Sequence, residues 1–216
     1  MNPFLVTAAL VAGFSGTALA APTMAERGMA QDARNAVHYE LIAADAEKAR
    51  SFVEKMAQDG IGFLGNAEMT QAKKEAEFKK LLQKSFDMAT IGRFALGQYW
   101  NSAGAAQRTE YQKLFEAMII RVYSARFSEY NGEQLNVTGA RAEGKDTVVS
   151  SVIVPRGSGS RVRVDWRVRE RNGAFKVVDV IIEGVSMAMT QRSDFSSVIQ
   201  RGGGDVQVLI DHLKKR

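Results

Sequence analysis

The sequence predicts an α+β fold with N-terminal helices, a four-stranded antiparallel meander sheet and two C-terminal helices. Two changes in hydrophobic periodicity predict this order. From Ala30 to Tyr130 the apolar residues recur at helical spacing, and after Asn131-Gly132 they alternate as in strands. Helical spacing then returns near the C-terminus. Because no repeat or long linker divides the chain, we expect a single folded domain.

The first twenty residues have the features of a secretory signal peptide. Residues 4–14 form a short apolar run, and Ala18-Leu19-Ala20 matches the A-x-A pattern that signal peptidase cleaves. The run is shorter than the ~20 residues that cross a membrane as a helix. The segment has no Lys or Arg, which a signal normally carries, so an attached N-terminal helix is the alternative. We expect cleavage near Ala20 and a mature domain of residues 21–216.

The composition is that of an ordinary globular domain and excludes several classes of protein. The 216 residues include no Cys, so disulfides and cysteine metal sites are absent. His38 and His212 lie at opposite ends of the chain, which disfavours a histidine metal pair. The net charge of +5 is low for a nucleic-acid-binding domain. We therefore expect no metal and no cofactor.

Several helices are predicted before the sheet. A weak apolar face precedes Gly60, and a second apolar face follows it. Asp87 is a candidate N-cap for a short helix that ends at Leu96, where Gly97 supplies the stop. The strongest amphipathic pattern follows, with apolar residues on one wide face. The three faces contain Phe52, Val53 and Met56; then Phe78, Leu81, Leu82, Phe86 and Ala89; then Tyr111, Leu114, Phe115, Met118, Ile119, Val122 and Tyr123.

Four strands follow in series, at residues 135–139, 145–155, 161–169 and 175–182. Short turns such as Asn172-Gly173 separate them, which predicts antiparallel hairpins. The last two helices contain Phe195, Val198 and Ile199, and then Leu209, Ile210 and Leu213 after an Asp205 N-cap.

No catalytic constellation can be assembled from the sequence. The segment Gly184 to Ala188 lacks the final glycine of a nucleophile elbow. Asp179 shares strand parity with Val177 and Ile181 and so is expected to face inward, where a carboxylate can act as a base. The alternative is a buried ion pair with an arginine such as Arg192.

The third strand alternates perfectly between two kinds of residue. Its apolar residues share one face, so its arginines share the other. That basic face is either a docking surface for an acidic partner or lipid headgroups, or a solvated outer face that opposes aggregation. The docking interpretation rests on Arg161, Arg163, Arg167 and Arg169.

Two sequence blocks resemble the periplasmic MlaC or toluene-tolerance family. The first runs from Ile91 to Trp100 and contains Leu96-Gly97-Gln98-Tyr99-Trp100; the second runs from Asp179 to Ser186. The order of the blocks and the closing helix agree as well, so the resemblance covers most of the mature chain. Met189-Thr190-Gln191 before Arg192 departs from the usual pattern and is more similar to a hopanoid-associated branch.

The resemblance implies a periplasmic carrier that shuttles phospholipid, or a hopanoid-type lipid, between an outer-membrane lipoprotein complex and an inner-membrane ABC transporter with an MCE-domain subunit. It implies no catalysis and an apolar cavity enclosed by the helices and the sheet. Arg192 is the candidate residue at the headgroup or mouth, with a structural pair to Glu183 or Asp179 as the alternative. The expected lining is Phe94, Leu96, Tyr99, Trp100, Phe115, Met118, Val122, Tyr123, Val162, Val164, Trp166, Val168, Val177, Ile181 and Met187.

Two other functions stay open at this point. The first is a cavity enzyme of the helix-plus-curved-sheet type that uses Asp179 as its base and a tyrosine such as Tyr99 as its donor. The second is a periplasmic adaptor that holds no ligand and docks a protein through its arginine-rich strand. Periodicity alone does not separate them, because the residues that would line a cavity would equally fill an ordinary core.

Overall fold

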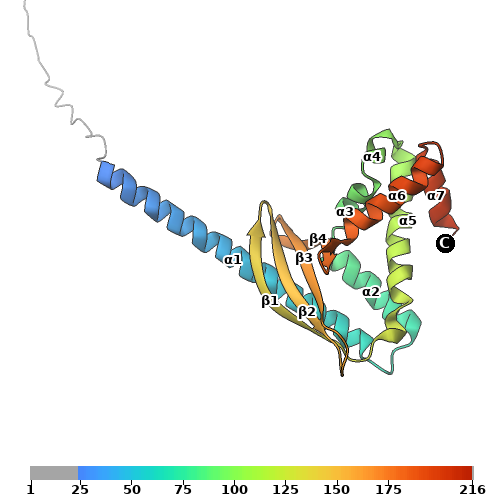
Figure 1. The fold of residues 1–216 in the computed structure, drawn as a ribbon, viewed down its shortest axis with the longest axis horizontal. Coiled ribbons are helices and arrows are strands. Elements are labelled where there is room, and N and C mark those ends of the chain that lie inside the picture. The colour runs from blue at the N-terminus through green and yellow to red at the C-terminus, as the bar shows by residue number, and fades with distance from the viewer. Residues whose placement is uncertain (1–23, 216) are drawn as a thin grey trace, which may run out of the picture. The chain divides into compact units, whose positions relative to one another are not determined.

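The computed structural model describes residues 24–215 (Figure 1). The predicted signal peptide, residues 1–20, lies outside the described residues. The chain divides into two compact units: one reaches to Tyr39 and is helical where it is described, and the other begins at Glu40. Helix α1, Met24–Leu64, spans the division. The sheet, the other helices and the cavity belong to the second unit.

The described elements follow the predicted order of helices, sheet and helices (Figure 1). The helices after α1 are α2 (Gln71–Ser85), α3 (Met88–Leu96), α4 (Tyr99–Ser102) and α5 (Ala105–Ser124), followed by the 3₁₀ turn Phe127–Glu129. The strands are β1 (Gln134–Glu143), β2 (Asp146–Val154), β3 (Val162–Arg171), β4 (Ala174–Ile182) and β5 (Val185–Ser186). Helices α6 (Met187–Arg201) and α7 (Val206–Lys214) follow them.

The sheet is an antiparallel meander in which the strands lie in chain order. This confirms the predicted topology, and β5 adds a two-residue strand that pairs with the end of β4. Asn172 and Gly173, which join β3 to β4, have φ values of 53° and 76°. Positive φ at both central residues matches the right-handed twist of the flanking strands, so this turn sets the register of the hairpin.

The predicted caps of α3 are confirmed. Asp87 accepts hydrogen bonds from the backbone N–H of Thr90 (2.9 Å) and from its hydroxyl (2.6 Å). Burial alone raises the pKa of Asp87, but these hydrogen bonds and the nearby Arg171 outweigh it and hold the pKa below its ordinary value. At the other end Gly97 adopts a φ of 60°, and a Cβ there would lie 2.8 Å from Nε of Arg192. The positive φ favours glycine at this position, and a larger residue would also displace the Arg192 guanidinium.

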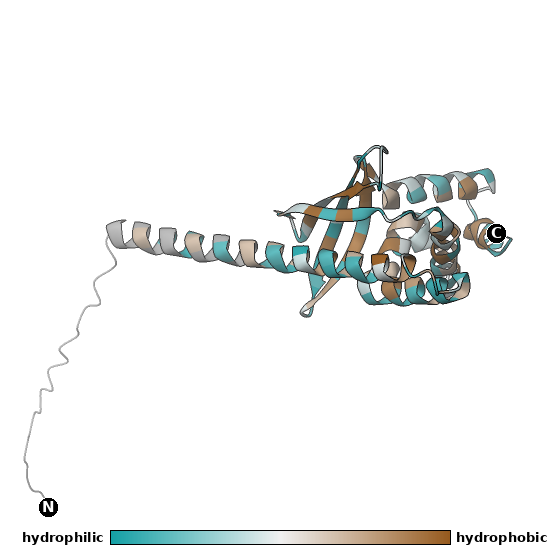
Figure 2. Ribbon diagram, turned by 90° about the horizontal axis from the view of Figure 1, so that it is seen from below, coloured by the Kyte–Doolittle hydropathy of each residue, from teal (hydrophilic) through white to brown (hydrophobic). Residues whose placement is uncertain are grey.

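The apolar side chains form two buried clusters. The helical core lies among α3, α5, α6 and α7 and is built around Leu96, Tyr111, Phe115, Phe195, Ile199, Leu209 and Ile210. The sheet core joins Ala49, Val53 and Met56 of α1 to Val149, Val168 and Val177. Apolar and hydrophilic positions alternate along the strands and around the helices, as expected for elements buried on one face (Figure 2).

Candidate functional site

One face of the sheet contributes to two features: part of it is buried in the sheet core, and the rest lines a cavity. Val149, Trp166 and Val180 lie opposite one another in adjacent strands and so share this face. Toward one end, α1 residues pack against it; toward the other, it borders a cavity of about 450 Å³. The lining comprises Phe78, Leu82, Phe86, Met88, Ile91, Phe115, Ile119, Tyr123, Leu135, Ile153, Val164, Trp166, Asp179, Val180, Ile182, Met187, Ala188, Thr190 and Gln191.

Helix α5 contributes to the cavity and to the helical core at once. Phe115, Ile119 and Tyr123 are spaced four residues apart and form one stripe that faces the cavity. Tyr111, one turn before Phe115 on the same stripe, and Met118, on an adjacent stripe, pack in the helical core. The wide apolar face of α5 predicted from the sequence therefore lines the cavity with some of its residues and packs in the helical core with others.

Helix α2 supplies a second wall of the cavity. Phe78 and Leu82 lie one turn apart, and Phe86 follows another turn later as the C-cap residue. None of the three was among the predicted lining residues. Their four-residue spacing was visible in the sequence, but no sequence pattern indicates that α2 borders the cavity.

Trp166 is fixed in the cavity wall by a hydrogen-bond relay. Its indole Nε1–H donates to Oγ of Ser151 at 2.9 Å, and the Ser151 hydroxyl donates to the carbonyl of Val164 at 2.8 Å. Ser151 is fully buried. Because the only polar atom of the indole is satisfied inside the wall, the ring presents an apolar surface to the cavity.

A β-bulge changes which residues of β4 face the cavity. The alternation in the sequence predicts that Val177 and Ile181 share one face. The pairing of β3 with β4 shifts register because Val178 is an extra residue in β4. Beyond this bulge, Val180 and Ile182 line the cavity and Ile181 does not.

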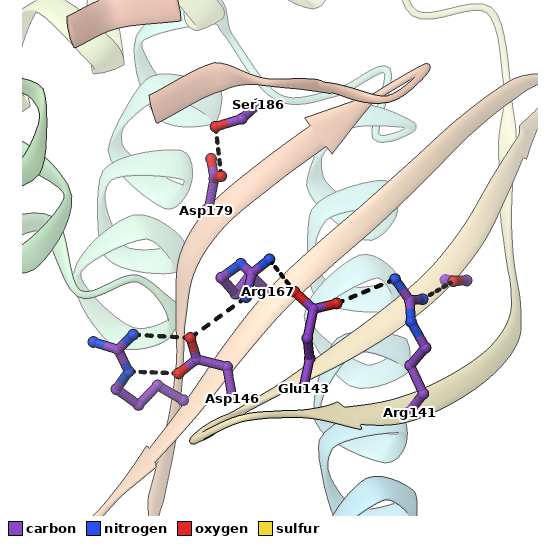
Figure 3. Close-up of polar contacts among 8 residues, drawn as sticks. Arg141, Glu143, Asp146, Arg167, Asp179 and Ser186 are labelled. Carbon is purple, nitrogen blue, oxygen red and sulfur yellow. Dashed lines mark hydrogen bonds and ion pairs between the residues drawn. The ribbon is translucent and has the colours of Figure 1, made fainter. Parts of the chain in front are cut away.

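The carboxylate of Asp179 lies at the junction of β4, β5 and α6, and its hydrogen bonds are local. One oxygen accepts from the Ser186 hydroxyl at 2.6 Å, and the other accepts from the backbone N–H groups of Val180 (2.8 Å) and Ala188 (3.1 Å). The pair formed by Asp179 and Ser186 lies apart from the arginine network of the sheet (Figure 3). This arrangement fastens the start of α6 to the sheet edge, and it replaces the predicted ion pair with Arg192.

Arg192 lies instead over the ring of Phe94, with its guanidinium carbon 5.3 Å from the ring centroid. Both side chains are exposed. Within residues 24–215 no carboxylate lies within ion-pair distance of Arg192, so the alternative pairs with Glu183 and Asp179 do not form. Its chain neighbours Thr190 and Gln191 line the cavity, although Arg192 itself does not.

The predicted lining residues are distributed over several parts of the molecule. Phe115, Tyr123, Val164, Trp166 and Met187 line the cavity. Leu96, Tyr99, Trp100 and Met118 lie in or against the helical core, and Val168 and Val177 lie in the sheet core. Phe94 and Val122 are exposed, and Val162 and Ile181 do not line the cavity. Only some of the predicted residues reach the cavity because a helix or strand that contacts several apolar neighbours buries different residues against each neighbour.

The arginine-rich strand does not present a uniformly free basic face. Arg169 makes a two-point contact with Asp146 at 2.6 Å and 2.9 Å, and Arg167 contacts Glu143 at 2.6 Å (Figure 3). The hydrogen bonds that Arg169 donates to Asp146 raise the pKa of its guanidinium above the ordinary value. Arg161 and Arg163 are exposed, and no ion pair of the described residues includes them. Half of the predicted docking surface is therefore neutralised within the sheet.

The described part of the chain shows neither a metal centre nor a membrane-spanning helix. Among these residues no group of three or more His, Cys, Asp or Glu side chains is placed to hold a metal ion. No described helix combines the length and the apolar character needed to cross a membrane.

Comparison with known sequences identifies the family. The profile of the MlaC protein family matches residues 54–215, which is most of the chain. The chain belongs to the MlaC family. The match begins within α1 and includes every element that lines the cavity, so the predicted resemblance is confirmed.

Two curated relatives of this MlaC family chain are similar over part of their length. The toluene tolerance protein ttg2D of Pseudomonas putida is 25% identical over 114 residues, which cover 53% of each chain. The intermembrane phospholipid transport system binding protein MlaC of Haemophilus influenzae is 23% identical over 121 residues, 54% of this chain and 56% of that protein. The chain spans about half the length of the curated relatives it matches.

A solved structure shares the fold. The phospholipid-binding protein from Ralstonia solanacearum, determined in complex with a phospholipid, superposes with a TM-score of 0.67 and 24% sequence identity. The match covers 77% of this chain and 95% of that one. The predicted α+β architecture is thus also the architecture of a known protein.

Proposed function

We propose that the chain is a lipid carrier that holds the acyl portion of a phospholipid in the cavity between the sheet and helices α2, α3, α5 and α6. The single observation that carries this proposal is the cavity itself, whose lining side chains are apolar except for Asp179, Thr190, Gln191 and the amphipathic Tyr123 and Trp166. A methylene group occupies roughly 30 Å³, about as much as a water molecule in the liquid. The cavity therefore has space on the order of 15 methylene groups.

The energetics favour such a carrier. Each methylene removed from water contributes about 0.8 kcal/mol, so 15 of them contribute roughly 12 kcal/mol of gross transfer free energy. A lipid that crosses water unaided bears this cost, and a soluble protein with an apolar cavity removes most of it. Family membership and the phospholipid bound by the Ralstonia protein support this substrate class. A hopanoid-type lipid is the alternative cargo.

The polar contacts of Asp179 support carriage over catalysis. Both carboxylate oxygens already accept hydrogen bonds from groups at the junction of β4, β5 and α6, namely the Ser186 hydroxyl and the backbone N–H groups of Val180 and Ala188. A general base needs an oxygen directed at the substrate proton. We therefore propose a binding role for the cavity, with no covalent step.

The proposal extends to location, partners and the headgroup. Residues 1–20 act as a signal peptide, and the mature domain shuttles lipid across the periplasm between an outer-membrane lipoprotein complex and an ABC transporter with an MCE-domain subunit. The headgroup stays at the mouth near Arg192. What supports this placement is that Arg192 is exposed, bears no carboxylate partner among the described residues and follows cavity-lining Gln191.

Lipid mass spectrometry tests the proposal directly. The mature chain is purified from a bacterial periplasm, shown to be folded by circular dichroism, and extracted under denaturing conditions. We expect near-stoichiometric phospholipid in the extract. A folded chain that carries no lipid and takes up none from phospholipid vesicles contradicts the proposal, and recovery of a hopanoid identifies the alternative cargo.

The role of Arg192 has its own test. Arg192→Ala is compared with Arg201→Ala, which removes an exposed arginine from the same helix. We expect Arg192→Ala to weaken retention of phospholipid roughly fivefold, because a charge-assisted hydrogen bond to phosphate is lost. Arg201→Ala leaves retention unchanged. If both variants behave alike, Arg192 has no role at the headgroup.

A further inference from the structure

A second surface feature lies on α3, α4 and the start of α5. Two guanidinium groups contact the indole ring of Trp100: that of Arg93 at 5.7 Å from the ring centroid and that of Arg108 at 5.4 Å. Arg108 also donates hydrogen bonds to the carbonyls of Trp100 (2.8 Å) and Asn101 (3.3 Å). Arg108 is therefore held in place before any partner arrives, and the same ring orders the exposed Arg93, which lowers the entropic cost of binding.

No acidic residue of this region neutralises the two arginines. The sequence between Asp87 and Glu110 contains no Asp or Glu. Glu110 itself pairs with Lys214 at 2.7 Å, and Asp87 caps α3. Across residues 24–215 no ion pair includes Arg93 or Arg108. This contrasts with Arg167 and Arg169, whose charges the sheet already balances.

The chemistry of this cluster fits a protein partner better than a membrane. Arginine and tryptophan are the residues enriched at the centres of protein interfaces, where a rigid aromatic ring supplies contact area and a guanidinium binds carboxylate at two points. Surfaces that bind anionic membranes instead carry clusters of several flexible cations. Within the cluster the cations are arginines held on an aromatic ring, with no lysine between Asp87 and Glu110.

We propose that Arg93, Trp100 and Arg108 form a docking surface for an acidic segment of a protein partner. Phe94, the chain neighbour of Arg93, carries Arg192 on its ring, and α6 continues from there to cavity-lining Gln191. Arg93, Trp100 and Arg108 are not among the residues that line the cavity. Docking and lipid binding use different residues, so the docking proposal can be confirmed or refuted independently of the proposed lipid carriage.

The test uses a fluorescein-labelled peptide of alternating glutamate and tyrosine and the whole mature chain, followed by fluorescence anisotropy at low salt. We expect the chain to bind the peptide and Arg93→Glu to weaken binding roughly tenfold. Arg126→Glu is the matched control, because Arg126 is also exposed, its replacement changes the net charge equally, and it follows the end of α5 opposite to Arg108. Arg126→Glu leaves peptide binding within about twofold, because only charges near the contact matter.

Three results overturn the proposal. The first is a wild-type chain that does not bind the peptide at low salt, and the second is an equal loss of binding for Arg93→Glu and Arg126→Glu. The third is a chain that binds phosphatidylglycerol vesicles through Arg93. In that case Arg93→Glu loses vesicle binding and keeps peptide binding. Arg93→Gln, with its melting temperature measured, replaces Arg93→Glu if the charge reversal unfolds the chain. Unchanged copurified lipid in these variants separates docking from carriage.

Discussion

Ile119 offers the sharpest test of the cavity, because the same helix provides a matched control. Ile119 lies between Phe115 and Tyr123 on the stripe of α5 that faces the cavity. Val122, three residues later, is 47% exposed and does not line the cavity. We compare Ile119→Asn with Val122→Asn, which replace a β-branched aliphatic side chain by the same amide at neighbouring positions of one helix.

The expected magnitude follows from the position of each side chain. A bound acyl chain covers the amide at position 119 and leaves it without a hydrogen-bond partner, which costs about 1–3 kcal/mol. Since about 1.4 kcal/mol is a factor of ten, lipid affinity falls roughly 5-fold to 150-fold. The amide at position 122 stays in water, so Val122→Asn leaves affinity within about twofold.

Affinity is measured by titration of delipidated protein with a phospholipid that carries a fluorescent acyl chain. Melting temperatures of both lipid-free variants verify that the fold is kept, and copurified lipid per protein gives an independent measure of retention. Equal affinities for Ile119→Asn and Val122→Asn, with both chains folded, would show that α5 does not contact the lipid tails and would refute the reasoning.

Three further predictions concern the scaffold. Tyr111→Phe removes the hydrogen bond from the buried hydroxyl to the carbonyl of Gly92 (2.8 Å) and lowers the free energy of unfolding by about 1 kcal/mol, measured by urea denaturation; no change would show that the bond contributes nothing. Asp146→Ala leaves the largely buried guanidinium of Arg169 unpaired and costs about 3 kcal/mol, whereas recovery of most of this loss in a second variant with Arg169→Met identifies the unpaired charge as the cause. The lowered pKa of Asp87 means that its ionised form stabilises the fold above the ordinary value of 3.8, and this contribution is lost as the pH falls through the folded-state pKa. The difference in unfolding free energy between wild type and Asp87→Asn is therefore largest near neutral pH and shrinks in acid, and a difference independent of pH contradicts this assignment.

Local sequence signals were sufficient for the four long strands, the main helices and their order, but not for the short elements α4 and β5. Asp87 and Asp205 accept hydrogen bonds from the first turns of their helices, as predicted from residue type and position. The positive φ values at Asn172 and Gly173 follow from the turn chemistry of that dipeptide. These features depend on residues close in sequence, so the sequence specifies them without knowledge of the rest of the fold.

The allocation of apolar residues between core and cavity depended on contacts between distant segments. Phe115 and Met118 belong to one apolar face of α5, yet only Phe115 reaches the cavity. Phe78 on α2 was omitted from the predicted lining although its periodicity was equally clear. Periodicity reports that a side chain is buried, and it carries no information on whether the facing atoms belong to protein or enclose a void.

The sequence by itself determined the family, the α+β order of elements, the helix caps and the alternation that gives the sheet one apolar face. Only the tertiary structure decided that α1 fills one end of that face and leaves a cavity at the other, and that the bulge at Val178 turns Val180 and Ile182 toward it. It also decided which arginines are neutralised, because Asp146 pairs with Arg169 only when the β2 and β3 strands lie side by side. Helix and strand formation depends on local periodicity, whereas cavities and ion pairs depend on distances that the chain acquires only on folding.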